Sequence, residues 1–375
     1  MKLMHLSDLH LGKRVNGFSM LEDQTYILRK IISIIEEETP EVILIAGDIY
    51  DRSIPPEEAV SLFDDFLVRL AKRKLDVCII SGNHDSEERV SYGGRLMDAS
   101  GIHPAPVYDG HISPLTLNDE FGEVVFWLIP FLKPADVRRF HPDAETGTYT
   151  DALGTVIEEL EIDRNKRNIA VSHQFITGAS ICESEEHTVG GLDDISAEVY
   201  VDFDYVALGH LHGPQKVGRE TVRYAGSPLK YSFSEASQKK SVTMIELGPK
   251  GETNIRLIPL EPMRDMKRIR GSFKEIISAV ERTEDYCEIT LTDEEDIPNA
   301  IDRLRVKYPY LMSMKYDNKR TRAQAGITGG ADVEKKTELE LFNELYEQQN
   351  GQPMSPEQEE YLREVIREIK GDVMI

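Results

Sequence analysis

Residues 1–12 read MKLMHLSDLHLG, residues 41–51 read EVILIAGDIYD, and residues 76–85 read DVCIISGNHD. Each stretch is a short apolar run that ends in polar residues. Similar runs follow at 123–131 (EVVFWLIPF), 168–175 (NIAVSHQF), 204–212 (DYVALGHLH) and 241–247 (SVTMIEL), and helical patterns lie between them, notably at 20–38 and 56–74. This alternation predicts an α/β layered domain with ligand-binding loops at the carboxyl ends of its strands.

Seven side chains that could ligate metal ions follow these strands. They comprise two carboxylates, one amide and four imidazoles: Asp8, His10, Asp48, Asn83, His173, His210 and His212. An aspartate and a histidine two residues apart at a strand end point to one side, so both can share one ion. A single carboxylate can bridge two cations about 3.5–4 Å apart. Oxygen and nitrogen donors without thiolate suit Mn²⁺ or Fe²⁺ and also tolerate Mg²⁺.

Each of these residues taken alone has an ordinary structural explanation. A histidine such as His173 is commonly a core or surface residue, an asparagine such as Asn83 commonly forms a turn, and aspartates cap helices. The pair in GHLH could simply lie in an exposed loop. The conjunction favours a metal centre, because five motifs follow apolar strands and three are preceded by glycines that permit close approach: Gly47, Gly82 and Gly209.

The composition describes a folded protein with a large acidic excess. Its 375 residues are 40% apolar and 30% charged, which suits one large domain with smaller additions. No apolar run is long enough to span a membrane and no secretory signal is visible, so we expect no membrane association. Three separated cysteines favour a reducing cytoplasm. The net charge of −23 argues against DNA binding through a globally basic surface, although part of the acidic excess lies in residues 332–375, which hold twelve Asp/Glu against five Lys/Arg.

Beyond residue 260 the pattern changes. Residues 267–280, 285–296 and 298–317 read as strand, helix, strand, helix and strand, which predicts a small α+β capping domain. Residues 319–332 (KRTRAQAGITGGAD) have the composition of a linker. We therefore expect domains at 1–262 and 263–320, a linker at 321–336, and amphipathic C-terminal helices in 337–375, the second of which begins with an N-cap at Ser355.

The motifs DLH, GD, GNHD, H and GHxH, in this order, resemble those of the calcineurin-like metallophosphoesterase superfamily. Three further stretches are similar to the bacterial SbcD family of nuclease subunits: MKLMHLSDLHLGK at the start, IPFLKPADVR at 129–138 and YAGSPLKYSFSE at 224–235. The resemblance covers roughly the first 320 residues. It implies an α/β fold in the form of a four-layer α/β/β/α sandwich, with a small α+β cap and C-terminal helices.

The resemblance also implies a site with two manganese ions, or with Fe²⁺ or Mg²⁺. His84 would face the phosphate, where it could protonate the leaving 3′ oxygen or stabilise charge, with Asp85 as its orienting partner. The alternative is a turn histidine with structural hydrogen bonds. The ions would activate a water for in-line attack. One ion would be bound by Asp8, His10, Asp48 and His212, and the other by Asp48, Asn83, His173 and His210.

The family's partners are further expectations. They comprise double-stranded DNA and an SMC-like ATPase, SbcC. The DNA would be degraded from its ends and opened at hairpins in repair, recombination and replication. The C-terminal helices at 337–350 and 355–370 would bind that ATPase, although simple packing on the cap would explain them equally well. A homodimer within a heterotetramer would use helices around 56–73 and 89–100. A cytoplasmic, nucleoid-associated protein is implied.

Basic and aromatic side chains beside the motifs are candidate DNA contacts, although most surface lysines and arginines are solvated bystanders. The candidates are Lys13, Arg14, Arg52, Arg89, Lys230 and Tyr231. Two alternative functions are weighed against the nuclease. A phosphatase or phosphodiesterase for nucleotides or other small phosphoesters would share every ligand, and a non-catalytic adaptor would be expected to lack ligands or His84, which are all present.

Overall fold

The computed structural model describes residues 1–185, 194–280 and 282–322, and in the C-terminal tail residues 339, 342–343, 346, 354–355 and 358–363. The chain divides into two compact units. The first comprises Met1–Arg270, Lys274–Thr290 and Asn299–Lys315, and the second comprises Gly271–Phe273, Leu291–Pro298 and Tyr316–Ile375. None of the helices in the described residues has both the length and the hydropathy needed to cross a membrane.

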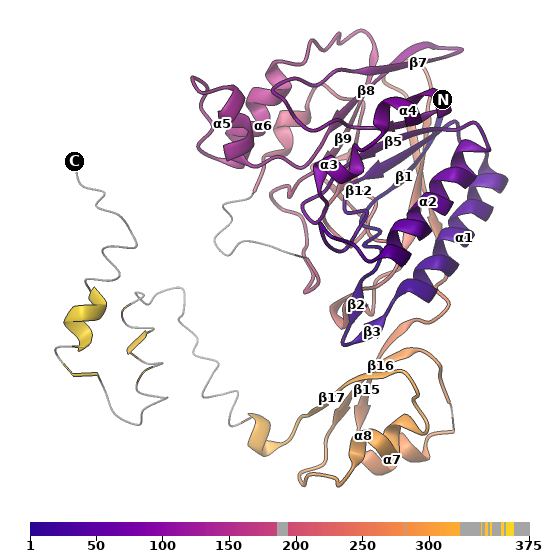
Figure 1. Cartoon of the computed structure of the whole chain (residues 1–375). Coiled ribbons are helices and arrows are strands. Elements are labelled where there is room, and N and C mark those ends of the chain that lie inside the picture. Colours follow the sequence, from indigo (N-terminus) through magenta and orange to yellow (C-terminus); the bar gives the residue numbers. More distant parts are fainter. Residues whose placement is uncertain are drawn as a thin grey trace. The chain divides into compact units, whose positions relative to one another are not determined.

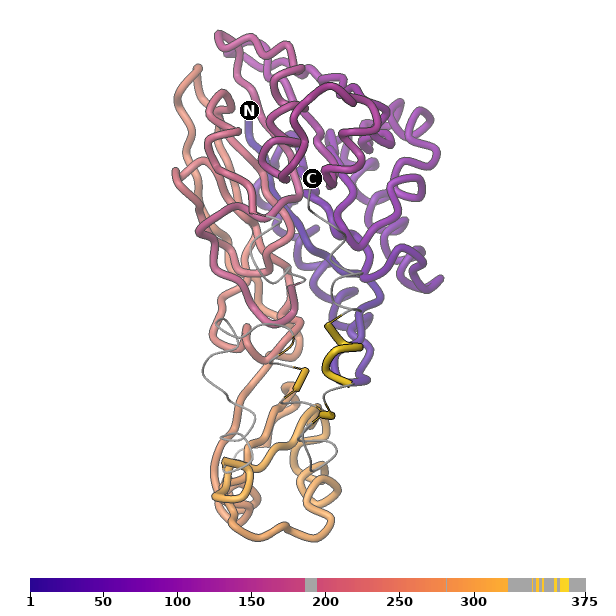
Figure 2. The backbone as a smooth tube through the Cα atoms, turned by 90° about the vertical axis from the view of Figure 1, so that its left-hand side faces the viewer, coloured from indigo at the N-terminus to yellow at the C-terminus, as the bar shows by residue number. Residues whose placement is uncertain are grey.

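Two six-stranded sheets form the larger part of the first unit. The first sheet has the order β14 (Thr253–Pro259), β13 (Ser241–Leu247), β1 (Lys2–Leu6), β4 (Val42–Ala46), β5 (Asp76–Ile80) and β6 (Ile102–Pro104). The second has the order β11 (Gln215–Val217), β12 (Arg219–Tyr224), β10 (Tyr205–Gly209), β9 (Arg167–His173), β8 (Gly122–Ile129) and β7 (Leu115–Asp119). The N-terminal strand β1 lies inside its sheet, antiparallel to β13 and parallel to β4. Figure 2 traces the backbone, with this N-terminal segment in indigo.

Along the central strands, alternate side chains point to opposite faces of the sheet, and both faces are covered. In β4 the side chains of Val42, Leu44 and Ala46 pack against the second sheet, whereas Ile43 and Ile45 pack under helices. All five are buried, as expected for a parallel strand between two layers. The helices α1 (Leu21–Glu38) and α2 (Glu57–Ala71) cover the first sheet, and α5 (Pro134–Phe140) and α6 (Tyr149–Glu158) cover the second (Figure 1). The fold is the expected four-layer α/β/β/α sandwich.

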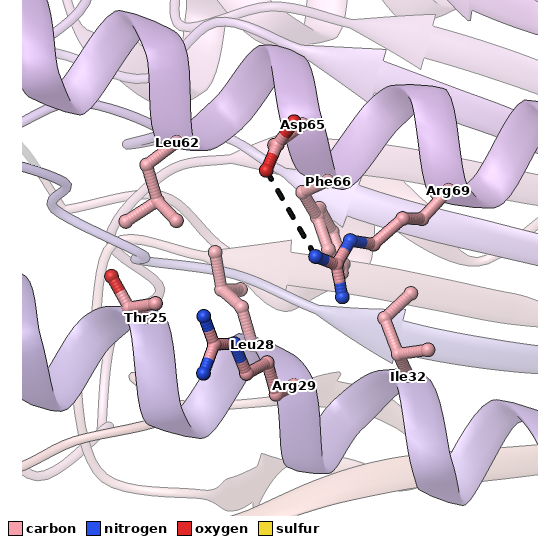
Figure 3. A pocket seen from close by; sticks show the side chains of 8 residues that line it. All are labelled: Thr25, Leu28, Arg29, Ile32, Leu62, Asp65, Phe66 and Arg69. Atoms are coloured by element: carbon pink, nitrogen blue, oxygen red, sulfur yellow. Dashed lines mark ion pairs between the residues drawn. The ribbon is translucent and has the colours of Figure 1, made fainter.

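The apolar face of α2 is used within this chain. Phe63, Phe66 and Leu70 are buried in the cluster between the helices and the first sheet. Figure 3 shows Leu62 and Phe66 opposite Leu28 and Ile32 of α1, with the Asp65–Arg69 ion pair (3.9 Å) at the rim. The cavity between them is about 30 Å³, roughly the space of one water molecule. Packing within the core of this chain therefore accounts for the spacing of the apolar residues along α2.

The prediction of a continuous helix around 89–100 is wrong. The structure has α3 (Glu87–Val90), α4 (Gly94–Met97) and a 3₁₀ turn at Asp98–Ser100. Gly93 interrupts the helix because it adopts a φ of +72°, a left-handed conformation that helical residues do not use. Its neighbours Tyr92 and Leu96 are more than four-fifths exposed.

A third sheet follows residue 265. It has the order β15 (Met266–Gly271), β16 (Tyr286–Leu291) and β17 (Leu311–Tyr316), with α7 (Phe273–Ser278) and α8 (Ala300–Arg305) between the strands, which is the predicted element order. Asp23 of α1 is fully buried and accepts hydrogen bonds from Arg264 Nη1 (2.9 Å) and the Tyr286 hydroxyl (2.6 Å). Our domain boundaries at 262, 320 and 336 stay predictions.

The two expected C-terminal helices lie largely outside the described residues. Within the described positions, 339, 342–343, 346 and 358–363 are helical. The predicted N-cap at Ser355 is present, because its hydroxyl accepts from the Gln358 main-chain N–H (3.3 Å) while Gln358 Oε1 accepts from the Ser355 N–H (2.9 Å).

Candidate metal centre

The candidate ligands lie at the carboxyl ends of parallel strands. In the first sheet β1, β4 and β5 are parallel, and in the second β8, β9 and β10 are parallel. Asp8, Asp48 and Asn83 follow the first three, His173 ends β9, and His210 follows β10 directly. The Asp8 N–H donates to the Gly47 carbonyl (3.1 Å) and ties neighbouring loops of the first sheet, and the His210 N–H donates to Asp8 Oδ1 (2.9 Å) from the second sheet. Parallel strand ends thus bring distant residues to one edge.

The seven predicted ligands lie close together, and we divide them into two clusters that share Asp48; Asp8 lies with His10 and His212 and also close to Asp48 and His173. The first cluster is Asp8, His10, Asp48 and His212, and the second cluster is Asp48, Asn83, His173 and His210. In the first, His10 Nε2 and His212 Nε2 are 3.0 Å apart. In the second, Asn83 Oδ1 lies 3.0 Å from His173 Nε2 and 2.9 Å from His210 Nδ1. Neighbouring ligand atoms of an octahedral cation with bonds near 2.1 Å lie ~3.0 Å apart, so these spacings fit.

The Asp48 carboxylate lies between the clusters. Its Oδ2 is 3.6 Å from His10 Nε2 and 3.4 Å from His173 Nε2. Its Oδ1 accepts from the His84 main-chain N–H (3.0 Å), which fixes the orientation of the group. One carboxylate oxygen therefore faces both clusters, as a bridging ligand would.

The polar atoms of the site are incompletely satisfied without a cation. Asp8 Oδ2 is buried and has no hydrogen-bond partner among the residues that the structure describes. Burying an unpaired carboxylate oxygen is costly, so a cation beside it would stabilise the fold. The donor set of carboxylates, one amide and imidazoles, with a buried oxygen left over, fits a divalent metal ion.

Backbone strain is concentrated at the same residues. Asp8 (φ +53°), His10 (+44°), Asp48 (+50°) and His210 (+102°) are non-glycine residues with positive φ. Such conformations cost on the order of 1–3 kcal/mol each and persist where surrounding contacts enforce them. Four of the seven candidate ligands are held in this way, which is typical of a functional site.

Two glycines permit the close approach of the loops. A Cβ on Gly82 would lie 2.2 Å from Asp48 Oδ1, and a Cβ on Gly209 would lie 1.8 Å from the Ala46 carbonyl oxygen and 2.7 Å from His173 Nδ1. Neither position has room for any side chain. The glycines noted before the GNHD and GHLH motifs therefore have a steric reason.

Burial sets the protonation of the imidazoles. It lowers the pKa of His210 to about 3 and that of His10 well below the usual value, so both imidazoles are neutral at pH 7. Burial also raises the pKa of Asp8 to about 6. Burial would lower the pKa of His173, but the Asp48 carboxylate outweighs it and raises this pKa to about 9. The site favours positive charge beside Asp48.

His84 is more exposed than three of the candidate ligands. Its side chain is 16% exposed, against 0–2% for His10, Asp48 and His173. Its Nδ1 lies 3.2 Å from the Asp51 carbonyl oxygen and its Nε2 lies 4.0 Å from Asp48 Oδ2. His84 is therefore partly exposed, and its Nδ1 is the ring nitrogen that faces a main-chain carbonyl.

The expected contact between Asp85 and the His84 ring is not what the structure has. Both Asp85 oxygens accept main-chain N–H bonds, from Ile49 (3.1 Å), Tyr50 (2.9 Å) and Gly82 (3.0 Å). Three N–H donors occupy the carboxylate, so it joins the loop after β4 to the loop after β5. The group that faces His84 Nδ1 is the Asp51 carbonyl.

Sequence reasoning missed a buried network behind His212. Its Nδ1 lies 2.8 Å from Ser184 Oγ, which donates to Glu235 Oε1 (2.6 Å). Lys240 Nζ is buried and binds Glu235 Oε2 (2.5 Å) and the His212 carbonyl oxygen (2.7 Å). A second missed residue is Gln24, which holds the loop of His10. In the sequence, these residues could have been recognised as polar residues on otherwise apolar faces.

Three of the candidate DNA contacts are exposed. Arg14, Arg52 and Arg89 lie on the surface beside the motif loops, and the Arg52 side chain is 77% exposed. Lys13 is partly buried, and its Nζ binds Asp51 Oδ1 (2.5 Å).

The structure contradicts the other two DNA contacts. Tyr231 is 3% exposed, and its hydroxyl donates to the Leu9 carbonyl oxygen, so it is a core residue behind the site. Lys230 is also largely covered, because its Nζ binds Asp265 Oδ1 (2.8 Å) and the Ala236 carbonyl oxygen (2.7 Å). Both side chains already have their partners inside the protein.

Comparisons with known proteins identify two matching family models and distantly similar solved structures. The family model described as calcineurin-like phosphoesterase matches residues 1–214, and that described as type 5 capsule protein repressor C-terminal domain matches residues 262–350. TT1561 of Thermus thermophilus and a dimetal phosphatase from Danio rerio are solved structures with 11% and 12% identity and TM-scores of 0.38 and 0.39. They cover 68% and 70% of this chain, and the matches span 98% and 99% of theirs.

Curated relatives narrow the assignment. The D subunit of the SbcCD nuclease of Staphylococcus epidermidis is 30% identical over 376 residues, with 98% of each chain covered. The same subunit of Staphylococcus saprophyticus is 34% identical over 321 residues, with 84% of each chain covered. The chain therefore belongs to the calcineurin-like phosphoesterases and, within them, to the SbcD family of metal-dependent nuclease subunits.

Proposed function

We propose that this chain cuts double-stranded DNA, from its ends and at hairpins, with two manganese ions held by the first and second clusters. The observation that carries the proposal is the position of Asp48 Oδ2, 3.6 Å from His10 Nε2 and 3.4 Å from His173 Nε2. When bound, a pair of divalent cations supplies charge neutralisation for the phosphodiester and lowers the pKa of an attacking water. The oxygen and nitrogen donors favour Mn²⁺.

His84 is the proposed proton donor or charge-stabilising group. Its Nδ1 faces the Asp51 carbonyl oxygen at 3.2 Å, and a proton on Nδ1 would hold the ring in place there. The partly exposed Nε2 is then oriented toward the substrate side, where it could protonate the leaving oxygen. His10, which is neutral, and His173, whose proton a bound cation would displace, are both deeply buried and are suited to ligation and not to this role.

Electrostatics favours a partner for DNA binding. Arg14, Arg52 and Arg89 are exposed near the site and are proposed to contact the DNA backbone. The net charge of −23 opposes tight binding by this chain alone. We propose that an SbcC-type SMC-like ATPase supplies further basic surface and binds the C-terminal segment 337–375. A homodimer of this chain within a heterotetramer, in the cytoplasm near the nucleoid, completes the proposal.

Degradation of an end-labelled duplex with Mn²⁺ tests the proposal, with wild type and His84→Gln compared side by side. We expect wild type to release labelled products. The variant should lose cleavage and still bind two ions, because the glutamine removes the proton donor and leaves every ligand intact. Asp48→Ala should lose ions and cleavage together.

The same experiment can reject the proposal. Absence of duplex and hairpin cleavage by wild type, both alone and with the ATPase partner, would favour a small phosphoester as the substrate. Wild-type cleavage by His84→Gln would remove His84 from the chemistry. A chromogenic phosphodiester is unsuitable here, because a nuclease and a small-molecule phosphodiesterase would both hydrolyse it.

A further inference from the structure

The loop that carries Asp8 and His10 is held from behind by two buried side chains. Gln24 of α1 is 1% exposed, and its Nε2 donates to the His10 carbonyl oxygen at 2.7 Å. Its Oε1 accepts from the Gly12 N–H at 3.0 Å. Gln24 therefore binds both ends of the turn that follows the His10 ligand, as a single amide with a donor and an acceptor can.

Tyr231 completes this contact from a distant part of the chain. Gln24 Nε2 also donates to its hydroxyl (3.1 Å), and the hydroxyl donates in turn to the Leu9 carbonyl oxygen. The Tyr231 ring lies edge-on to two imidazoles, with centroids 5.6 Å from His10 and 5.9 Å from His212. One aromatic ring thus limits the rotation of both imidazoles whose Nε2 atoms face each other at 3.0 Å.

These contacts reach one cluster and not the other. Of the second cluster, His173 is oriented by the Ala46 carbonyl oxygen at 2.8 Å from its Nδ1. Asn83 Oδ1 is fixed by His173 and His210. No contact recorded for Gln24 or Tyr231 in the described residues involves these three side chains.

We infer that Gln24 and Tyr231 are positioning residues that act as one unit and set the affinity of the first cluster for its ion. The inference rests on the proposed two-ion site. Groups that orient ligands from behind typically change metal affinity by about 10–100-fold. The strained φ of His10, +44°, gives a physical reason, because a strained loop relaxes when the bonds that enforce it are removed.

Titration of the metal-free protein with Mn²⁺, by calorimetry and by the electron paramagnetic resonance signal of unbound Mn²⁺, tests this inference. Variants His212→Ala and His210→Ala each remove one imidazole from one cluster and so assign the two affinities. We expect Gln24→Met, which keeps length but removes all hydrogen bonds, and Tyr231→Phe, which keeps the ring, to weaken the first affinity by about 10–100-fold. The second affinity should stay within about twofold.

The double variant tests whether the two residues act together. If they do, Gln24→Met/Tyr231→Phe should lose no more than the larger single loss, within about twofold, because residues of one network are not additive. Tyr205→Phe is the matched control. Its hydroxyl binds His5 Nδ1 (3.0 Å) in the core between the sheets, so its removal should leave both affinities unchanged.

Several outcomes would overturn the inference. Equal weakening of both affinities, unchanged affinities in Gln24→Met and Tyr231→Phe, or the same loss in Tyr205→Phe would each assign these residues a general structural role. Should Gln24→Met fail to fold, Tyr231→Phe alone still decides. A wild-type protein that binds fewer than two ions would instead reject the proposed function, so the two failures are distinguishable.

Discussion

The two ligand clusters are supported in different ways. Behind the first cluster lie side chains from distant parts of the chain, with Gln24 and Tyr231 at the His10 loop and Ser184 and Glu235 at His212. The second cluster is supported by backbone, since His173 Nδ1 faces the Ala46 carbonyl oxygen (2.8 Å) and glycines allow the loops to touch. A backbone contact cannot be changed by replacing a side chain, so the geometry of the second cluster is fixed. The geometry of the first cluster depends on supporting side chains and can be altered by substituting them.

The largest expected effect comes from crowding the second cluster. In Gly209→Ala the new methyl group would meet the Ala46 carbonyl oxygen at 1.8 Å, and no flexible side chain can move aside. We expect a loss of more than about 5 kcal/mol in the free energy of unfolding, enough to unfold a typical domain. Urea denaturation followed by far-UV circular dichroism measures it.

The matched control for this substitution is Gly154→Ala. Gly154 lies within α6 and has nothing within 4 Å of an added Cβ, so alanine should stabilise the helix by about 0.5–1 kcal/mol. A Gly209→Ala protein that unfolds at the wild-type urea concentration would show that the second cluster is adjustable after all.

A smaller loss is expected from breaking the ion pair behind His212. Lys240 and Glu235 are both buried, and Lys240→Met would leave the Glu235 carboxylate without its cation. Removal of one partner of a buried ion pair costs about 3–5 kcal/mol. We expect a corresponding fall in stability in chemical denaturation, together with weaker Mn²⁺ binding at the first cluster alone.

A second substitution distinguishes charge from packing. In Lys240→Met/Glu235→Gln no buried charge remains, and the glutamine oxygen can still accept from Ser184, so most of the lost stability should return. If the double variant were as unstable as the single one, the packing around Lys240, and not the unpaired carboxylate, would be responsible.

The smallest effect is expected at Ser184. Ser184→Ala removes the hydroxyl that lies 2.8 Å from His212 Nδ1 and donates to Glu235, which costs about 1 kcal/mol of stability. Mn²⁺ affinity at the first cluster should fall by about tenfold, with the second cluster unaffected. Calorimetric titration measures this, and Ser33→Ala on the exposed face of α1 is the control because Ser33 donates within its own helix. A fall in both affinities would contradict the separation of the clusters.

The alternation of apolar strands and helical patterns predicted the α/β layered domain, the resemblance implied its four layers, and the positions of the motifs predicted that the seven candidate ligands lie together. Asp8, Asp48 and Asn83 directly follow apolar strands, and parallel strands place such residues at one edge whatever lies between them. Their roles as metal ligands stay predictions. Gly82 and Gly209 were correctly associated with close approach for the same local reason.

The supporting residues could not be predicted in the same way. Tyr231 and Lys230 were candidate DNA contacts because they stand beside a motif loop. Each is instead bound inside the protein to a residue distant in sequence, Tyr231 to Leu9 and Lys230 to Asp265. Gln24 did leave a signal, since it stands on the helical face of Ile27, Leu28 and Ile31, where a polar side chain needs a buried partner.

Asp23 and Gln24 are neighbours in the first turn of α1, and this adjacency limits how the chain can be divided. Asp23 binds Arg264 and Tyr286, which belong to the segment after residue 262, whereas Gln24 binds the loop of His10. A shortened chain that ends at residue 262 would leave the Asp23 carboxylate without either partner, one residue away from the side chain that supports the His10 loop. Such a shortened protein should have a lower free energy of unfolding, and the loop that carries Asp8 and His10 should be the first part to lose its structure.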